Sequence, residues 1–201
     1  MIIDALHLGD RSPSELAQLT GLGTNLVAFH LDVLEGLGLI ERRTSEGDRR
    51  RRYVRLHHEV VGVQAPAGAI RADDVLFVCT ANSARSQLAA ALWQRATDRP
   101  ARSAGQRPAA QVHPSAVAVA EAHGLGLGDR RPQGYEALEH APDLIVSVCD
   151  RALEAGLPFD VPRLHWSVPD PVDGGSAAVT RAYDELEVRV TWLAAGRAGV
   201  A

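Results

Sequence analysis

The first sixty residues carry the hydrophobic spacing of two short helices. The sequence Ser-Pro-Ser-Glu at 12–15 predicts a helix start, because serine can cap the helix, proline fits its first turn and glutamate completes a capping box. We expect this helix to end near Leu19. Thr24 can cap a second helix, which should end at Gly38. The apolar residues of the second helix follow a period of about 3.6 residues: Val27, Leu31, Leu34 and Leu37.

Two strand-like runs follow these helices. Residues 39–43 and 52–56 mix apolar and polar positions and are separated by a polar turn at 45–48, which predicts an antiparallel hairpin. A helix, a short turn, a second helix and a hairpin form the order of a winged helix-turn-helix. The sequence therefore predicts that fold for residues 1–63.

The pattern changes after residues 64–72, a stretch of small residues with proline and glycine that we interpret as a linker. Residues 75–78 and 144–148 are short apolar runs, typical of buried parallel strands. Helical patterns cover 86–96, 114–123 and 178–193. Strands that alternate with helices predict an α/β fold with a parallel sheet for residues 73–198.

Composition narrows the class of protein. The chain has 201 residues, 46% of them hydrophobic, with no apolar run long enough to span a membrane and no signal-peptide pattern, so we expect a cytoplasmic protein. Two cysteines are too few for a disulfide scaffold, which makes free thiols the expectation. A net charge of −4 argues against general affinity for nucleic acid. The arginines between 42 and 55 are nevertheless a local basic cluster.

The strongest chemical signal is the sequence Cys-Thr-Ala-Asn-Ser-Ala-Arg-Ser at 79–86, between a predicted strand and a predicted helix. Such a loop directs backbone N–H groups and the positive end of the helix dipole at one point, where an oxyanion can bind. Arg85 can close on the anion with two hydrogen bonds, and the same field favours a Cys79 thiolate. The alternative is a buried structural cysteine with Arg85 at the surface. The predicted oxyanion loop consists of Thr80, Ala81, Asn82, Ser83, Ala84, Arg85 and Ser86.

The pattern Cys-x-x-Asn-x-x-Arg-Ser after an apolar strand resembles the low-molecular-weight phosphotyrosine phosphatase fold. Residues 73–195 also resemble its arsenate reductase branch, through the sequences at 102–105, 112–114, 143–146 and 165–171. The resemblance implies that Asp170, in an Asp-Pro pair, is the general acid. It also implies that Cys149 matches the resolving cysteine of thioredoxin-coupled arsenate reductases. Their third cysteine would fall near Gly156 and is absent, and a structural role for Cys149 stays open.

Residues 106–111 lack the aromatic side chains that hold the phosphotyrosine ring in the phosphatases, which favours a small inorganic oxyanion, arsenate or phosphate. We therefore predict an arsenate reductase in which Cys79, Arg85, Asp170 and Cys149 are catalytic. No bound cofactor or metal is expected, and the reductant is an external thiol from a mycothiol/mycoredoxin, glutathione or thioredoxin system. The alternatives are a phosphatase of phosphoproteins or small phosphate esters, and a regulator whose Cys79 loop senses an oxyanion without turnover.

Residues 5–60 resemble the arsenical-resistance repressor (ArsR) family of winged helices, through Thr-Gly-Leu at 20–22 and the apolar positions up to 40. The predicted DNA contacts are Thr24, Asn25, Ala28 and Phe29 on the second helix and Arg49, Arg50, Arg51 and Arg52 on the wing.

This N-terminal sequence departs from the family pattern in several places. Asp32 and Glu35 would repel phosphates, and the first helix lacks the cysteine pair of the family's arsenite site. There is little room for the N-terminal helix that usually helps such domains to form homodimers. Residues 57–59, His-His-Glu, could bind a metal, but adjacent side chains point in different directions, so we expect them to be solvated.

Overall fold

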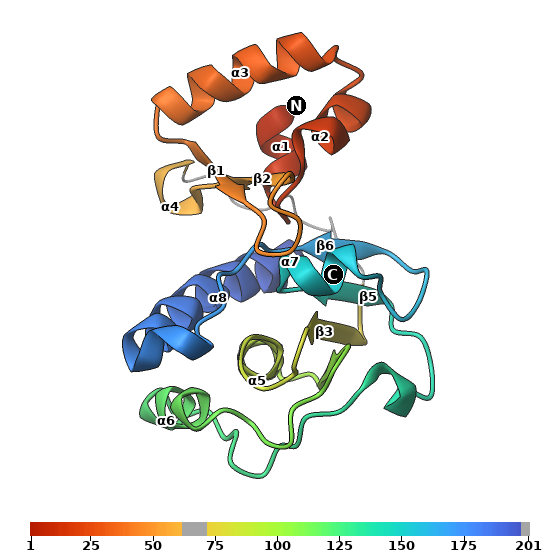
Figure 1. Ribbon diagram of the computed structural model, residues 1–201, viewed down its shortest axis with the longest axis vertical. Helices are drawn as coiled ribbons and strands as arrows, with labels where there is room; N and C mark the ends of the chain where they lie inside the picture. Colours follow the sequence, from red (N-terminus) through yellow and green to blue (C-terminus); the bar gives the residue numbers. More distant parts are fainter. Residues whose placement is uncertain (62–71, 198–201) are drawn as a thin grey trace.

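The computed structural model describes residues 1–61 and 72–197 of the chain (Figure 1). A four-stranded, fully parallel sheet in the order β4-β3-β5-β6 forms the centre of the C-terminal part. Its strands are β3 (Val75–Cys79), β4 (Ala101–Gly105), β5 (Leu144–Ser147) and β6 (Arg163–His165). The helices of this part are α5 (Arg85–Thr97), α6 (Pro114–Ala122), α7 (Asp150–Glu154) and α8 (Gly175–Arg197), with 3-10 turns η1 (Tyr135–Ala137) and η2 (Val172–Gly174). The predicted parallel α/β fold is confirmed.

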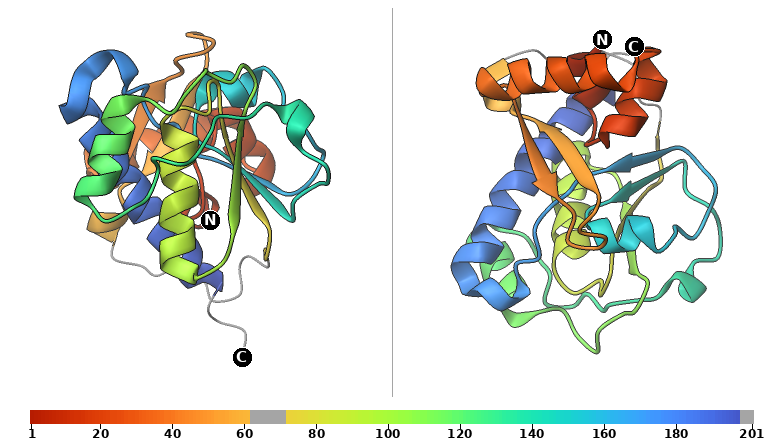
Figure 2. Two further views of the ribbon diagram at one scale, coloured as in Figure 1. Left: turned by 90° about the horizontal axis from the view of Figure 1, so that it is seen from below. Right: turned by 45° about the horizontal axis from the view of Figure 1, so that its top comes forward.

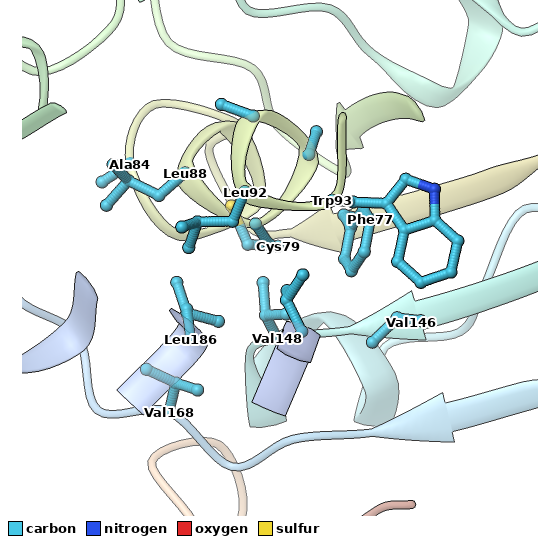
Figure 3. Close-up of a cluster of buried hydrophobic side chains, with 14 of the residues drawn as sticks. Phe77, Cys79, Ala84, Leu88, Leu92, Trp93, Val146, Val148, Val168 and Leu186 are labelled. Atoms are coloured by element: carbon cyan, nitrogen blue, oxygen red, sulfur yellow. The ribbon is translucent and has the colours of Figure 1, made fainter. Parts of the chain in front are cut away.

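Side chains of β3 alternate between the two faces of the sheet, because successive residues of a strand point in opposite directions. Val75, Phe77 and Cys79 belong to the larger core cluster, which α5, α6 and α8 cover. Figure 3 shows part of this cluster, with Cys79 among its members. Leu76 and Val78 belong to the smaller cluster on the opposite face. The strand is thus buried on both sides, which explains its unbroken apolar sequence.

Residues 1–61 have a hydrophobic cluster of their own, built on Leu6, Leu16, Val27, Leu31, Ile40, Val54 and Leu56. The elements are α1 (Ile2–Leu6), α2 (Pro13–Thr20), α3 (Thr24–Gly36), the antiparallel hairpin of β1 (Ile40–Thr44) and β2 (Arg52–Leu56), and α4 (His58–Val61). Ser12 caps α2 through the predicted capping box with Glu15. The turn of the hairpin reaches α7, as the right-hand view of Figure 2 shows.

A short segment at residues 8–10 joins the two parts along β6. The Asp10 N–H donates to the carbonyl of His165 over 2.7 Å, and the indole of Trp166 donates to the carbonyl of Leu8 over 2.9 Å. Gly9 is required there, because an added Cβ would lie 2.9 Å from the His165 carbonyl oxygen. The segment therefore covers the free edge of β6, which would otherwise present unpaired backbone groups.

Several sequence predictions for these elements were wrong. Thr24 is the first residue of α3 rather than its cap, because Gly23 occupies the N-cap position. Leu37 is exposed instead of buried, although Gly38 ends the helix as predicted, with a left-handed φ of 69° after the last helical residue, Gly36. His58 was expected to be solvated, but it is buried, donates to the carbonyl of His7 over 2.9 Å and packs against Trp192.

The pattern also left α1, β4 and β6 unpredicted, and α1 occupies the place where little room for a helix was expected. The predicted linker, residues 64–72, lies outside the described residues except for Ala72, which is buried. Among the residues that the structure describes, no helix has both the length and the hydropathy to cross a bilayer.

Candidate active site

Cys79 is the last residue of β3, and the loop that follows leads directly into α5. Its Sγ accepts a hydrogen bond from the backbone N–H of Asn82 over 3.2 Å and lies 3.1 Å from Oγ of Ser86. Both contacts fit a thiolate, because each places a donor on the sulfur. The sulfur is therefore held by its own loop and by the first turn of α5.

Asn82 fixes the shape of this loop. Its backbone is in the left-handed region, with φ of 49°, and its Nδ2 donates to Oγ of Ser86 over 2.8 Å. Its Oδ1 accepts from Nε2 of Gln87 over 3.1 Å and from the N–H of Gln133 over 2.9 Å. Gly105 of β4 lies against the same loop, since an added Cβ would be 2.8 Å from both the Asn82 nitrogen and the Thr80 carbonyl oxygen. Asparagine tolerates the left-handed backbone better than most residues, which explains its presence here.

Arg85 is almost completely buried, with 4% of its side chain exposed, and it is oriented by three acceptors. Nη1 donates to the carbonyl of Val168 over 2.8 Å and more weakly to Glu46 over 3.4 Å. Nη2 donates to Asp170 over 2.7 Å. Of the five N–H groups of a guanidinium, Nε–H and the second Nη2 hydrogen have no partner among the described residues. Those two form the edge of an arginine that binds an oxyanion in bidentate fashion.

The charges around Arg85 also keep it protonated. Burial alone would lower its pKa, but electrostatic attraction by Cys149, Cys79 and Asp170 outweighs that effect and raises the pKa above its ordinary value. The guanidinium is therefore a permanent positive charge beside the cysteine loop.

A cleft of about 560 Å³ opens in front of this loop. Its walls include Cys79, Arg85, Asp170, residues 109–111 and Arg151. Among the described residues, no Phe, Tyr or Trp lines it. The cleft therefore has room for an oxyanion and lacks an aromatic surface for a phenyl ring.

Cys149 lies beside the loop, between the end of the neighbouring strand β5 and the start of α7. Val78 of β3 is paired with Ser147 of β5, so Cys149 comes just beyond the position opposite Cys79. Its Sγ is 3.2 Å from Oγ1 of Thr80. Both thiols are free and buried. The structure thus brings all four predicted catalytic side chains to the carboxyl end of the sheet, where ligands of parallel α/β folds bind.

Sequence reasoning missed a second set of polar residues next to the cleft. Nε2 of His165 is 3.0 Å from Asp150, whose other carboxylate oxygen accepts the N–H of Glu46 over 2.9 Å. Burial would raise the pKa of Asp150, but the hydrogen bonds from His165 and from the Glu46 amide lower it. The Glu46 carboxylate in turn accepts the N–H of Asp170 over 2.8 Å. No local spacing could reveal these contacts, because Glu46 and Asp170 are 124 residues apart.

The eight predicted DNA-contact residues are all exposed: four lie on α3, residues 49–51 lie in the connection between β1 and β2, and Arg52 is the first residue of β2. Thr24 and the arginines at 50–52 line one groove of about 860 Å³, together with the start of α2 and Arg163. The described parts of the chain contain no cluster of three or more metal-binding side chains.

The part of the chain that matches known proteins coincides with the α/β part of the fold. The family model for low molecular weight phosphotyrosine protein phosphatase matches residues 74–197. The chain belongs to this family. An arsenate reductase of Brevibacillus brevis is 31% identical over 121 residues, which are 58% of this chain and 90% of that protein. The chain is therefore an enzyme of a family whose members include arsenate reductases and phosphatases.

Solved structures agree with this assignment. The crystal structure of arsenate reductase from Archaeoglobus fulgidus has a TM-score of 0.54 and 32% identity, and the match covers 60% of this chain and 98% of that one. The tyrosine phosphatase Wzb from Escherichia coli K30, in complex with sulphate, has a TM-score of 0.56 and 25% identity, covering 62% and 97% of the two chains. The match with each covers nearly all of that protein and about three fifths of this chain.

Proposed function

We propose that this chain reduces arsenate to arsenite with an external thiol as reductant. The observation that carries the proposal is the cleft in which Cys79, Arg85 and Asp170 converge without an aromatic wall. The sequence similarity to the arsenate reductase of Brevibacillus brevis supports the same substrate.

In the first step, arsenate binds to the loop and to the free edge of Arg85. The Cys79 thiolate attacks arsenic and forms a sulfur–arsenic bond, while one arsenic–oxygen bond breaks and that oxygen leaves as water. Asp170, which Arg85 holds at the mouth of the cleft, takes up a proton from solvent and passes it to the leaving oxygen. The positive guanidinium stabilises the charge that develops on the arsenic oxygens.

In the second step, a thiol attacks Sγ of Cys79. A disulfide forms, the sulfur–arsenic bond breaks and its two electrons stay on arsenic, which leaves as arsenite. The contact of 3.2 Å between Sγ of Cys149 and Oγ1 of Thr80, the residue after Cys79, supports Cys149 as the attacking thiol. We propose that the attacking thiol is either Cys149 or an external thiol. The candidate reductants are the mycothiol/mycoredoxin, glutathione and thioredoxin systems.

The test measures arsenite release from arsenate with each reductant system, for wild type, Cys79→Ser and Cys149→Ser. We expect Cys79→Ser to abolish release, since serine is a far weaker nucleophile. Unchanged turnover of Cys149→Ser with a small external thiol would exclude the internal route. Arsenite release that survives in Cys79→Ser would refute the mechanism.

A phosphatase is the second candidate, because the same thiolate, arginine and aspartic acid can hydrolyse a phosphate ester. The fold similarity to the phosphatase Wzb favours it. Hydrolysis of p-nitrophenyl phosphate without any arsenite formation would select this function.

We also propose that residues 1–63 form a winged helix-turn-helix domain, fused to the catalytic domain at 73–198, and that they bind DNA in a cytoplasmic, arsenic-responsive repressor. The exposure of Phe29 and of the arginines at 49–52 supports this proposal. The test is a gel shift at low and physiological salt; no shift at low salt, with the protein shown to be dimeric, would refute it.

A further inference from the structure

The turn of the N-terminal hairpin places a carboxylate against the two charged groups of the cleft. Glu46 accepts the backbone N–H of Asp170 through Oε1 over 2.8 Å and through Oε2 over 3.1 Å. Its Oε2 is also 3.4 Å from Nη1 of Arg85. One side chain from the hairpin therefore contacts both groups that the proposed chemistry requires.

Contacts on the backbone of Glu46 hold it in this place. Its N–H donates to Asp150 over 2.9 Å, and its carbonyl accepts from Nε of Arg151 over 3.1 Å. Both partners come from α7, at the carboxyl end of β5. The position of the carboxylate is thus fixed independently of its own contacts with the cleft.

The rest of the turn is attached to α7 through a different carboxylate. Glu154 accepts from the hydroxyl of Ser45 over 2.7 Å, from the N–H of Asp48 over 2.6 Å and from the hydroxyl of Tyr53 over 3.1 Å. No hydrogen bond or ion pair joins Glu154 to Arg85 or Asp170 among the described residues. Attachment of the hairpin and contact with the cleft are therefore separable by mutation.

We propose that Glu46 is a positioning residue for the reaction at Cys79: its carboxylate holds the backbone of Asp170 and the Nη1 end of Arg85, so that the opposite edge of the guanidinium faces the anion. This proposal rests on the proposed function, because it assigns Asp170 and Arg85 to that chemistry. The N-terminal part thereby contributes to the active site of the α/β part.

Glu46 should have two opposite effects, one on turnover and one on the binding of the oxyanion. Its hydrogen bonds to the Asp170 amide favour turnover by ordering the acid. Its negative charge opposes binding of an oxyanion, because like charges repel across the cleft rim. The amide contacts are much shorter than the contact with Arg85, so we expect the positioning effect to dominate the turnover number.

The test compares Glu46→Ala and Glu46→Gln with the matched control Glu154→Gln, in the full chain. Glu46→Ala should lower kcat for p-nitrophenyl phosphate by about threefold to tenfold, as expected for the loss of one net hydrogen bond. Glu46→Gln keeps an acceptor for the Asp170 amide and should stay within about twofold of wild type. Both variants should bind inorganic phosphate about twofold to threefold more tightly, and less so at high salt.

A purely structural role would give another pattern. If Glu46 only attached the hairpin, Glu154→Gln would reproduce the loss of kcat, and phosphate affinity would not change in either Glu46 variant. That pattern would overturn the proposal.

The amide resonance of Asp170 provides a readout that does not need turnover. We expect its proton to shift upfield in Glu46→Ala and to stay near the wild-type position in Glu46→Gln and Glu154→Gln. If wild type turns over neither arsenate nor the phosphate ester, the proposed function fails. The phosphate titration and the Asp170 amide resonance still test whether Glu46 positions Asp170 and Arg85. An unchanged Asp170 resonance in Glu46→Ala refutes this positioning role.

Discussion

Replacing Asp10 by asparagine should destabilise the whole chain, because it breaks the most buried ion pair between the two parts. Nη1 and Nη2 of Arg189 donate to the two carboxylate oxygens of Asp10 over 3.0 and 2.9 Å. The side chains are only 4% and 1% exposed. The N–H of Ser167 also donates to this carboxylate over 2.7 Å. Asparagine has the same shape as aspartate, but its NH₂ group would face an N–H donor of Arg189 or Ser167, where no hydrogen bond can form.

The size of the effect follows from burial. Removing one partner of a buried ion pair costs about 3–5 kcal/mol, since the remaining charge is left without compensation. Here Glu185 still accepts from Nε of Arg189 over 3.2 Å, which places Asp10→Asn near the lower end. We therefore expect a loss of about 3 kcal/mol in the free energy of unfolding, or about 6–12 °C in Tm for a chain of this size.

The assay is thermal and urea unfolding followed by circular dichroism. The control is Arg50→Gln, which removes an exposed pair with Asp48 in which the arginine side chain is 91% exposed, and which should cost under about 1 kcal/mol. A double variant, Asp10→Leu with Arg189→Met, should recover much of the loss, because no buried charge remains unpaired. If Asp10→Asn costs less than 1 kcal/mol, the pair does not hold the two parts together and the reasoning fails.

Two further predictions follow from local geometry. Gly105→Ala should lower activity at least tenfold and reduce stability by about 1–3 kcal/mol, because its Cβ would meet the Asn82 nitrogen and the Thr80 carbonyl at 2.8 Å; the check is turnover together with Tm, and wild-type turnover would contradict it. Burial lowers the pKa of His58, so the unfolded chain takes up the proton first as the pH falls below about 6.5. The contribution of His58 to the free energy of unfolding is complete above that pH and decreases as the pH falls below it. His58→Phe should flatten this decline, whereas His57→Gln should retain it; equal pH profiles of Tm for wild type and His58→Phe would contradict the assignment.

The residues of the cysteine loop could be predicted because their information is local. An apolar run, a polar loop and an alanine-rich helix follow one another directly in 75–97, and this order alone fixes where Cys79 and Arg85 lie. Asp170 and Cys149 needed the family resemblance, because each comes from a different strand end.

Other elements depend on partners that no local pattern reveals. β4 and β6 are short strands with polar residues, Ala-Arg-Ser-Ala-Gly and Arg-Leu-His, and they exist because β3 and β5 offer free edges. His58 looked like a solvated residue in a polar segment, but Trp192 from the far end of the chain buries it. Such contacts join residues distant in sequence, where spacing carries no signal.

For the hairpin of β1 and β2, the sequence predicted the exposed arginines but not the contacts of the preceding residues with α7. The sequence predicted a turn with arginines suited to DNA, and the side chains of 49–52 are exposed, in the connection between β1 and β2 and at the start of β2. The preceding residues, 45–48, instead attach to α7, and Glu46 reaches Arg85. Glu46 lies next to the cleft because its backbone is bonded to Asp150 and Arg151 of α7, while the side chains of residues 49–52 are exposed. None of the hydrogen bonds described above for Glu46 involves the arginines at 49–52, so the proposed contact of these arginines with DNA can be tested by mutation without removing those bonds.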